Sequence, residues 1–287
     1  MSVSRIAERF ATLKAEGRAG FIPYVMAGDP DAATALAILR GLPAAGADLI
    51  ELGFPFSDPM AEGPSIQLGA QRARAAGMTL TGVLALARAF RDGDETTPLI
   101  LMGYMNPLVG WGFEAFAQDA AAAGVDGLIV VDCPPEEAGP LADALDAAGV
   151  ALIRLATPTS DDDRLAVITA RTSGFVYYVS VAGVTGVKSA DAAAIAPQVA
   201  RVRAASGLPV AVGFGIRMPE RAAQVARVAD AVVVGSALVD AVAEAGEMNE
   251  DVTAHVLVRA KCLAKAVRFA RAGLTSGGLT SAGLTAV

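Results

Sequence analysis

The sequence is poor in the residues that build metal centres and disulfide frameworks. It contains two cysteines, Cys133 and Cys262, and a single histidine, His255. The cysteines are far apart and form no CxxC pair, so neither a disulfide scaffold nor a zinc knuckle is expected. Any Ser-His-Asp arrangement would have to use His255, which falls in a predicted helix away from the strand ends and is expected to be structural or solvated. We therefore predict no metal site.

Long apolar runs and a basic surface are also lacking. Asp, Arg or Gly interrupts every apolar segment before it reaches the ~20 residues that a membrane-spanning helix requires. The net charge is −7 and no basic stripe is visible, which argues against nucleic-acid binding. An anionic substrate would therefore have to be held by local groups. Residues 1–18 lack the continuous apolar core of a signal peptide, so the cytoplasm is the expected compartment.

Apolar residues, in contrast, are abundant. Hydrophobic residues make up 54% of the chain and charged residues 18%, and the mean hydropathy is +0.48. This composition excludes a disordered chain, which needs low hydrophobicity and high charge. A length of 287 residues suits one large domain.

A short pattern recurs along the chain: a small residue and Gly, followed by a run of β-branched or large apolar residues. The Gly is typical of a helix end, and the apolar run is typical of a parallel strand that is buried on both faces. Eight strands are predicted within 20–28, 44–53, 97–104, 122–132, 147–156, 172–180, 205–215 and 228–237. Ala-rich helices are predicted at 32–45, 79–92, 112–123, 135–147, 161–171, 197–205, 219–228 and 250–270.

Eight consecutive strand–helix units predict a closed (β/α)₈ barrel, a TIM barrel, with an open doubly wound sheet as the alternative. We assign residues 1–272 to the barrel. Ile6, Phe10 and Leu13 form an apolar stripe on an extra N-terminal helix that should cover the bottom of the barrel. Residues 273–287 are rich in Gly, Thr and Ser and are expected to form a flexible tail.

Active sites of such barrels lie at the carboxyl ends of the strands. Glu51 places a carboxyl group inside an apolar run, where desolvation disfavours its charged form. It is either a salt-bridged residue at a strand end or a general acid/base with a raised pKa. The loop at 54–64 contains three prolines and several polar residues, which is typical of a lid or a partner surface, although a stiff connector would also have this composition.

Glycines gather at the ends of the last three strands. They allow backbone amides to approach an anion closely, and the loops after strands seven and eight are the usual phosphate site of such barrels. The glycines are Gly183 and Gly186, then Gly213 and Gly215, and finally Gly235, which precedes Ser236. We predict a phosphate site that neutral backbone donors can form in an acidic protein. Earlier in the same region, Tyr177 and Tyr178 should point to opposite faces, so that one faces the barrel axis.

The segment from Glu51 to Pro59, with the sequence ELGFPFSDP, resembles the signature of tryptophan synthase alpha chains. The GPSIQ segment at 63–67 is similar to that family as well. The other similar segments are 24–30, 102–107, 180–186, 213–216 and 235–237. The resemblance extends in order over residues 3–268.

The resemblance implies a TIM-barrel lyase that cleaves indole-3-glycerol phosphate to indole and glyceraldehyde 3-phosphate with no metal or cofactor. It implies that Glu51 is the catalytic acid/base. Glu62 would be the second catalytic carboxylate, at a position where the family usually has Asp. Indole would then pass to a beta chain for the synthesis of L-tryptophan.

The resemblance also implies positions for substrate and partner. Indole itself needs an apolar slot, for which the candidates are Tyr24, Ile66, Met102, Val131, Leu155 and Phe214, with Tyr104, Tyr177 and Thr185 as further substrate contacts. The phosphate is expected at Gly186, Gly215, Gly235 and Ser236. A beta chain that uses pyridoxal phosphate would complete an alpha2-beta2 heterotetramer and face Pro55, Asp58 and Pro59.

Two other functions stay open from the sequence. The first is another phosphate-binding barrel enzyme, such as an epimerase or another biosynthetic isomerase or synthase. An epimerase of that kind would need metal-ligating histidines that this sequence lacks. A catalytically silent barrel that activates a partner is the second alternative, and the presence of Glu51 argues against it.

Overall fold

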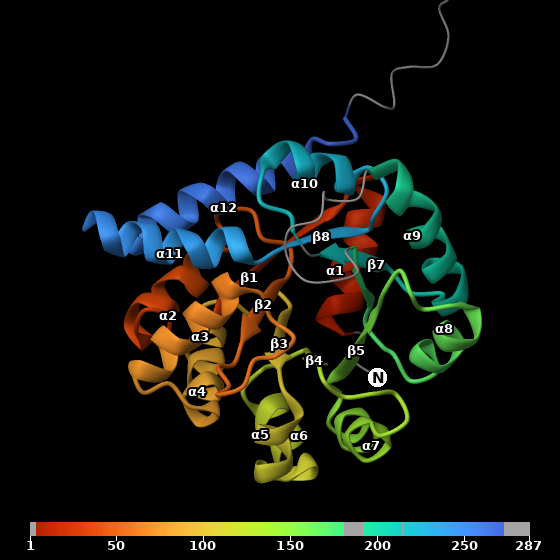
Figure 1. Ribbon diagram of the computed structural model, residues 1–287, viewed down its shortest axis with the longest axis horizontal. Helices are drawn as coiled ribbons and strands as arrows, with labels where there is room; N and C mark the ends of the chain where they lie inside the picture. Colours follow the sequence, from red (N-terminus) through yellow and green to blue (C-terminus); the bar gives the residue numbers. More distant parts are fainter. Residues whose placement is uncertain (1–3, 181–191, 214, 273–287) are drawn as a thin grey trace, which may run out of the picture.

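The computed structural model describes residues 4–180, 192–213 and 215–272. Within these ranges, parallel strands form a closed barrel in which each strand pairs with the next and β8 returns to β1 (Figure 1). The strands are β1 (Gly20–Met26), β2 (Ile50–Gly53), β3 (Leu99–Gly103), β4 (Gly127–Val130), β5 (Ala151–Ala156), β6 (Val176–Val179), β7 (Val210–Gly213) and β8 (Ala231–Val234). The closure confirms the predicted (β/α)₈ barrel and rules out the open sheet.

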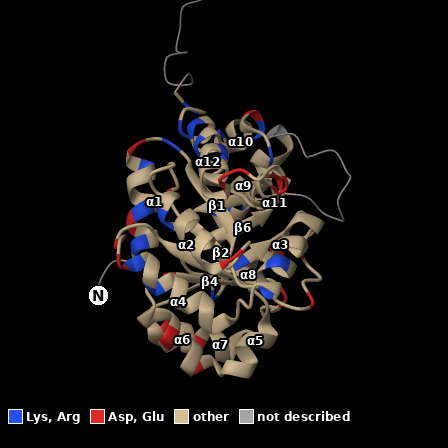
Figure 2. Ribbon diagram, turned by 90° about the vertical axis from the view of Figure 1, so that its left-hand side faces the viewer, with Lys and Arg blue, Asp and Glu red and all other residues tan. Residues whose placement is uncertain are grey.

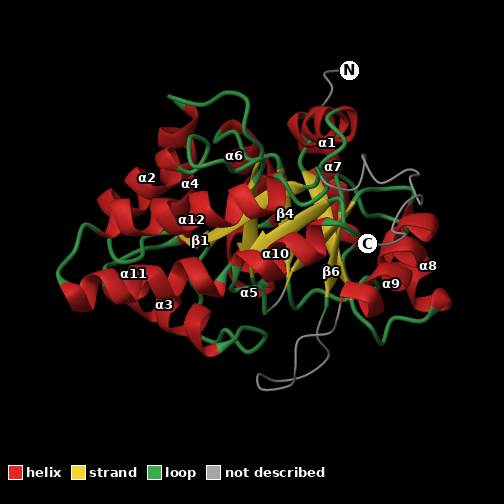
Figure 3. Ribbon diagram, turned by 90° about the horizontal axis from the view of Figure 1, so that it is seen from above, coloured by secondary structure: helices red, strands yellow, loops and turns green. Residues whose placement is uncertain are grey.

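Helices surround the strands on the outside of the barrel (Figure 3). They are α1 (Arg5–Ala15), α2 (Ala32–Gly41), α3 (Pro64–Ala75), α4 (Leu80–Arg91), α5 (Met105–Trp111), α6 (Phe113–Ala122), α7 (Gly139–Ala148), α8 (Asp162–Thr169), α9 (Ala192–Ser206), α10 (Pro219–Ala226), α11 (Ser236–Met248) and α12 (Val252–Arg268). None of the helices described here combines the length and apolar content needed to cross a bilayer. The predicted tail at 273–287 lies outside the described residues.

Three observed helices, α3, α5 and α11, lie largely outside the ranges that the sequence pattern predicts. α3 begins at Pro64, and proline fits a first helical turn because its missing N–H would have no partner there. α11 begins at Ser236, two residues after β8 ends, so no separate loop marks its start. The predicted helix start at 197 is wrong, because α9 begins at Ala192 and includes Pro197.

The strand side chains alternate between two apolar layers. On β3, Ile100 belongs to the cluster inside the barrel, whereas Leu99 and Leu101 pack outward with the helices. β4 repeats the pattern, with Ile129 inside and Leu128 outside. The strands are therefore buried on both faces, as their continuous apolar runs predict.

α1 covers one end of this interior cluster, as predicted. Its apolar stripe, Ile6, Phe10 and Leu13, is buried in the same cluster as the inward-facing strand residues. The ring of Phe10 lies 5.7 Å from the ring of Phe175, which precedes β6. Burial of each such side chain contributes about 1.5–3 kcal/mol, so α1 contributes substantially to closing the amino-terminal end of the barrel.

The amino-terminal ends of the strands share a hydrogen-bond pattern that repeats at every second strand. A polar side chain just before each even-numbered strand accepts a hydrogen bond from a backbone N–H at the start of the preceding odd-numbered strand. The pairs are Asp48 with Phe21 (2.9 Å), Asp126 with Leu99 (2.8 Å), Ser173 with Leu152 (3.0 Å) and Asp230 with Val210 (2.8 Å). These bonds join neighbouring strands at the end opposite the predicted site.

Arginines neutralise the buried aspartates at this end. Arg18 donates two hydrogen bonds of 2.8 Å to Asp48, and Arg91 donates one of 2.6 Å to Asp126. Arg5, on α1, adds a 2.9 Å contact to Asp126, and Figure 2 shows basic and acidic positions side by side around α1. Removing one partner of such a buried pair leaves the other charge without compensation.

We expect Asp126→Ala to lower the free energy of unfolding by about 3–5 kcal/mol. Arg91 and the N–H of Leu99 would both lose a buried acceptor. Denaturant unfolding followed by circular dichroism measures the change. The control is Asp143→Ala, which removes an exposed ion pair with Arg171 that is worth about 0–1 kcal/mol. Equal losses in the two variants would contradict a structural role for the buried aspartates.

Candidate active site

Glu51 points into the barrel because of its position in β2. The side chains of Leu49 and Glu51 face inward, whereas Ile50 and Leu52 pack in the outer layer. The side chain is fully buried, and neither carboxylate oxygen has a hydrogen-bond partner among the described residues. Burial, with a further contribution from the charge of Glu62, raises the pKa of Glu51 to about 8. Its carboxyl group can therefore take up and release a proton near neutral pH.

Glu62 lies in the loop between β2 and α3, which Tyr104 holds in place. The Tyr104 ring stacks on Phe56 with 5.1 Å between the ring centres, and its hydroxyl accepts a 3.0 Å hydrogen bond from the N–H of Ala61. On the other side, the Gln67 side chain donates a 2.9 Å hydrogen bond to the Glu62 carbonyl. Burial raises the pKa of Glu62 to about 7. The loop thus brings a second carboxyl group to Glu51.

Tyr24 and Tyr177 flank the two carboxyl groups. A Cβ built on Gly53 would lie 2.0 Å from the Tyr24 hydroxyl oxygen, and one built on Gly213 would lie 2.0 Å from the Tyr177 hydroxyl oxygen. Each tyrosine therefore occupies space that a neighbouring glycine leaves free. Burial and the charges of Glu51 and Glu62 raise the pKa of both tyrosines well above its usual value. Tyr177 faces the barrel axis and Tyr178 the outer layer, as the alternation predicts.

The predicted apolar slot lies at the top of the interior core. Met102, Val131 and Leu155 pack against the interior cluster but stay partly exposed. Ile66, from the first turn of α3, is buried beside Tyr24 in a smaller cluster that Met102 also contacts. The structure thus brings these predicted residues together around an apolar surface. Phe214 and Thr185 lie outside the described residues.

Gly235, which follows β8, lies next to this surface, beside Tyr24. Gly235 directly precedes α11, and a Cβ built on it would lie 3.4 Å from Tyr24. Ser236 begins the helix. The first backbone N–H groups of a helix have no hydrogen-bond partner within it, and the helix dipole at this end attracts an anion. Gly215 has a left-handed backbone with φ of +70°, a conformation that residues with a side chain rarely adopt. Gly186 lies outside the described residues.

The three residues predicted to face a partner lie in the loop that carries Glu62. Asp58 is exposed, while Pro55 and Pro59 are partly buried. Met60, next to Pro59, is 76% exposed, which is unusual for a large apolar side chain.

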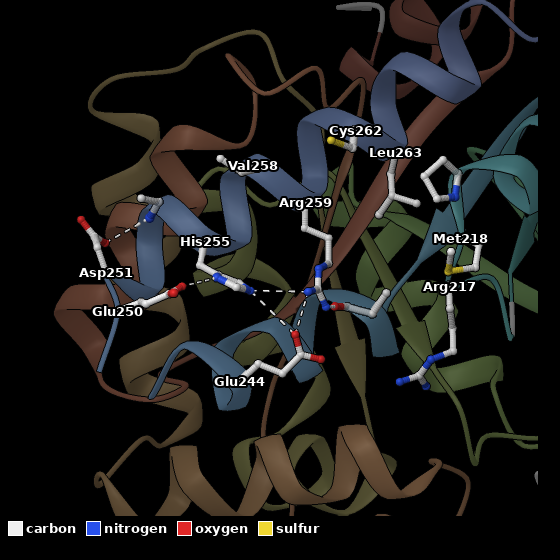
Figure 4. Close-up of a pocket in the computed structure, with 13 residues that line it drawn as sticks. Arg217, Met218, Glu244, Glu250, Asp251, His255, Val258, Arg259, Cys262 and Leu263 are labelled. Carbon is white, nitrogen blue, oxygen red and sulfur yellow. Dashed lines mark hydrogen bonds and ion pairs between the residues drawn. The ribbon is translucent and has the colours of Figure 1, made fainter. Parts of the chain in front are cut away.

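A separate groove of about 750 Å³ lies on the outer surface between α10, α11 and α12 (Figure 4). None of the predicted site residues that the structure describes lines it. Its charged groups pair with one another: His255 contacts Glu250 at 2.8 Å, and Arg259 donates to Glu244 at 2.7 Å. His255 therefore lies in a network of charged side chains on α12, outside the barrel interior. The unpaired carboxyl group of Glu51 places the candidate site in the barrel, away from this groove.

The sequence pattern does not reveal the buried ion pair between Asp29 and Arg72. Asp29 follows β1 and Arg72 lies in α3, which the pattern does not predict as a helix. The proline after Asp29 points to a turn, but nothing in the sequence indicates its partner. Among the residues that the structure describes, no three His, Cys, Asp or Glu side chains gather as a metal site would require.

The closed barrel, the two carboxyl groups at its carboxyl end and the helix start after Gly235 are typical of a TIM-barrel enzyme. A sequence model of the family "Tryptophan synthase alpha chain" matches residues 10–268. The chain belongs to the tryptophan synthase alpha chain family.

Curated relatives and solved structures agree with this assignment. The tryptophan synthase alpha chain of Phenylobacterium zucineum (strain HLK1) is 79% identical over 271 residues, which cover 94% of this chain and 98% of the relative. That of Caulobacter vibrioides (strain NA1000 / CB15N) is 71% identical over 273 residues, covering 95% and 99%. The crystal structure of tryptophan synthase subunit alpha from Legionella pneumophila str. Paris is 39% identical, with a TM-score of 0.86 over 93% of this chain and 99% of that chain.

We expect the stability of the protein to fall as the pH rises from about 5 to 8. The pKa values of Glu51 and Glu62 in the folded state, about 8 and 7, lie above the ordinary value of 4.5. The folded state therefore binds more protons than the unfolded state in this window. The free energy of unfolding is highest below pH 4.5 and falls as the pH rises through the folded-state pKa values. The loss is on the order of a few kcal/mol.

Denaturant unfolding at a series of pH values measures this loss. Glu51→Gln, which cannot ionise, should flatten the profile and become more stable than the unsubstituted chain at pH 9. Parallel profiles for the two proteins would show that Glu51 is not held out of water.

Proposed function

We propose that this chain is the alpha subunit of a tryptophan synthase and cleaves indole-3-glycerol phosphate to indole and glyceraldehyde 3-phosphate. The observation that carries the proposal is the carboxyl group of Glu51, which is fully buried, faces the barrel interior and has no hydrogen-bond partner. Family membership and the second carboxyl group of Glu62 support it.

The reaction is a retro-aldol cleavage in which Glu51 moves two protons. Its protonated carboxyl group delivers a proton to C3 of the indole ring. The resulting carboxylate then removes the proton of the hydroxyl on the substrate's glycerol phosphate side chain. The bond between C3 and the hydroxyl-bearing carbon breaks, its electron pair returns to the ring, and an aldehyde is released. A pKa of about 8 keeps Glu51 largely protonated at neutral pH, as the first step requires.

Glu62 has the complementary role. Protonation at C3 places positive charge on the indole nitrogen, and a carboxylate near that nitrogen stabilises the charge. The pKa of Glu62, about 7, is lower than that of Glu51, so Glu62 ionises first as the pH rises. The two carboxyl groups can therefore hold opposite protonation states near neutral pH.

The remaining predicted residues bind the substrate. Tyr24, Ile66, Met102, Val131, Leu155 and Phe214 line the apolar slot for indole, and Tyr104, Tyr177 and Thr185 are further contacts. The phosphate binds the amides of Gly186, Gly215, Gly235 and Ser236, where no cationic side chain is needed. The chain itself uses neither a metal nor a cofactor in this proposal.

The partner is a tryptophan synthase beta chain, which carries pyridoxal phosphate and receives indole within an alpha2-beta2 heterotetramer. Pro55, Asp58 and Pro59 face it, and the exposed Met60 in the same loop supports a contact surface there. The cytoplasm is the proposed compartment, and the free thiols of Cys133 and Cys262 fit a reducing environment.

A steady-state assay of the purified chain with indole-3-glycerol phosphate tests the proposal. We expect Glu51→Gln to fold normally and to lose activity by about 10²–10⁴-fold, because the amide cannot shuttle protons. Glu62→Gln should retain more activity than Glu51→Gln, since it removes charge stabilisation alone. If the unsubstituted chain shows no turnover, even with a beta chain present, the proposal fails and the alternative of a catalytically silent barrel holds. A loss of less than tenfold in Glu51→Gln would remove the acid/base role.

Gly235→Val tests the phosphate site without straining the backbone. The φ of Gly235 is −111°, outside the left-handed region, and a Cβ there would lie 3.4 Å from Tyr24. The branched side chain would, however, screen the amides at the start of α11. We expect weaker binding of glycerol 3-phosphate in calorimetry, with little change in thermal stability. Unchanged affinity would show that the phosphate does not bind at Gly235.

A further inference from the structure

A buried ion pair lies at the carboxyl end of the barrel, beside the candidate site. Arg72 donates hydrogen bonds of 2.7 and 2.8 Å to the two carboxylate oxygens of Asp29. The Asp29 side chain is 1% exposed. Such a two-pronged contact fixes the orientation of both side chains, because the planar guanidinium matches the planar carboxylate.

The surroundings of the pair are apolar. A cavity of about 10 Å³ borders Asp29 and is lined otherwise by Val25, Met26, Ala35, Ile38, Val239 and Val242. Its volume is at the lower limit for a single water molecule. Burial raises the pKa of Asp29 even though Arg72 opposes the shift. Asp29 is therefore enclosed by apolar side chains, and Arg72, which is 30% exposed, provides its counter-charge.

The pair joins three elements. Asp29 follows β1, Arg72 lies in α3, and the Arg72 guanidinium also contacts the carbonyl of Val239 in α11 at 3.3 Å. Gly69 allows this close approach, since a Cβ there would lie 2.7 Å from Val239 and 3.0 Å from an Asp29 oxygen. α3 is thus tied both to β1 and to the first turn of α11.

Both helices begin at the candidate site. The loop that enters α3 carries Glu62, and Gln67 in the first turn of α3 holds the Glu62 carbonyl at 2.9 Å. α11 begins at Gly235 and Ser236, the proposed phosphate site. A shift of α3 relative to α11 would therefore change the distance between the carboxyl group and the phosphate-binding amides.

We propose that Asp29 and Arg72 are positioning residues that fix Glu62 relative to the phosphate-binding start of α11. They act through α3 and α11 and do not touch the substrate. The inference rests on the proposed function, because it assigns the reaction's second carboxyl group and phosphate site to the ends that the ion pair holds together.

The test compares Arg72→Met and Arg72→Lys with the unsubstituted chain in the indole-3-glycerol phosphate assay. Misplacement by about 1 Å can cost on the order of 10²-fold in rate. We expect Arg72→Met to lower kcat about 10–100-fold and to raise KM. Arg72→Lys keeps the charge but loses the two-pronged contact, so its kcat and KM should lie between those of Arg72→Met and the unsubstituted chain. Glycerol 3-phosphate binding, measured by calorimetry, should weaken in the same order.

The control is Arg18→Met, which breaks the matched buried pair with Asp48 at the opposite end of the barrel. Arg18 also donates two hydrogen bonds of 2.8 Å to one carboxylate, and both partners are largely buried. We expect Arg18→Met to lower stability while kcat, KM and the pH profile stay unchanged.

If Arg72→Lys folds and has the kcat, KM and phosphate affinity of the unsubstituted chain, the positioning role is overturned. The same holds if Arg18→Met lowers activity as much as Arg72→Met, since the effect would then be one of stability. If the unsubstituted chain has no lyase activity, the proposed function fails by itself. The inference is then judged by glycerol 3-phosphate binding alone, where unchanged affinity in both Arg72 variants would overturn it.

Discussion

The carboxyl group of Glu51 is kept from water by the closed barrel, and the chemistry of the site depends on that exclusion. Burial raises its pKa to about 8, and the apolar core beneath it offers no hydrogen-bond donor. The barrel interior stays dry because inward-facing side chains fill it and α1 covers the far end. In an open sheet the same carboxyl group would be solvated, and its pKa would stay near 4.5.

Buried carboxyl groups have opposite surroundings at the two ends of the barrel. At the amino end, Asp48 and Asp126 each accept a backbone N–H and pair with arginine, so their charges stabilise the fold. At the carboxyl end, Glu51 has no such partner, and the cost of burying it is borne by the rest of the structure. The Asp29–Arg72 pair at this second end is an ion pair that joins α3 to β1 and α11.

Much of the fold could be predicted because its signals are local. A glycine followed by an apolar run marks most of the strands, and alternation along β6 correctly predicts that Tyr177 and Tyr178 point to opposite faces. α3 and α11 could not be predicted in the same way, since each begins directly at site residues that read as loop or strand end. The predicted roles of Thr185, Gly186 and Phe214 stay predictions, because these residues lie outside the described part of the chain.

The sequence by itself determined the order of the strands, the unusual carboxylate at position 51 and the glycines near the phosphate site. These depend on neighbours along the chain, which composition and spacing record. The tertiary structure alone decided that Glu62 lies near enough to raise the pKa of Glu51 and that Tyr24 fills the space above Gly53. It also decided that Asp29 meets Arg72, 43 positions further on. Such contacts follow from strand register and from how loops and helices pack against one another, which no local pattern encodes.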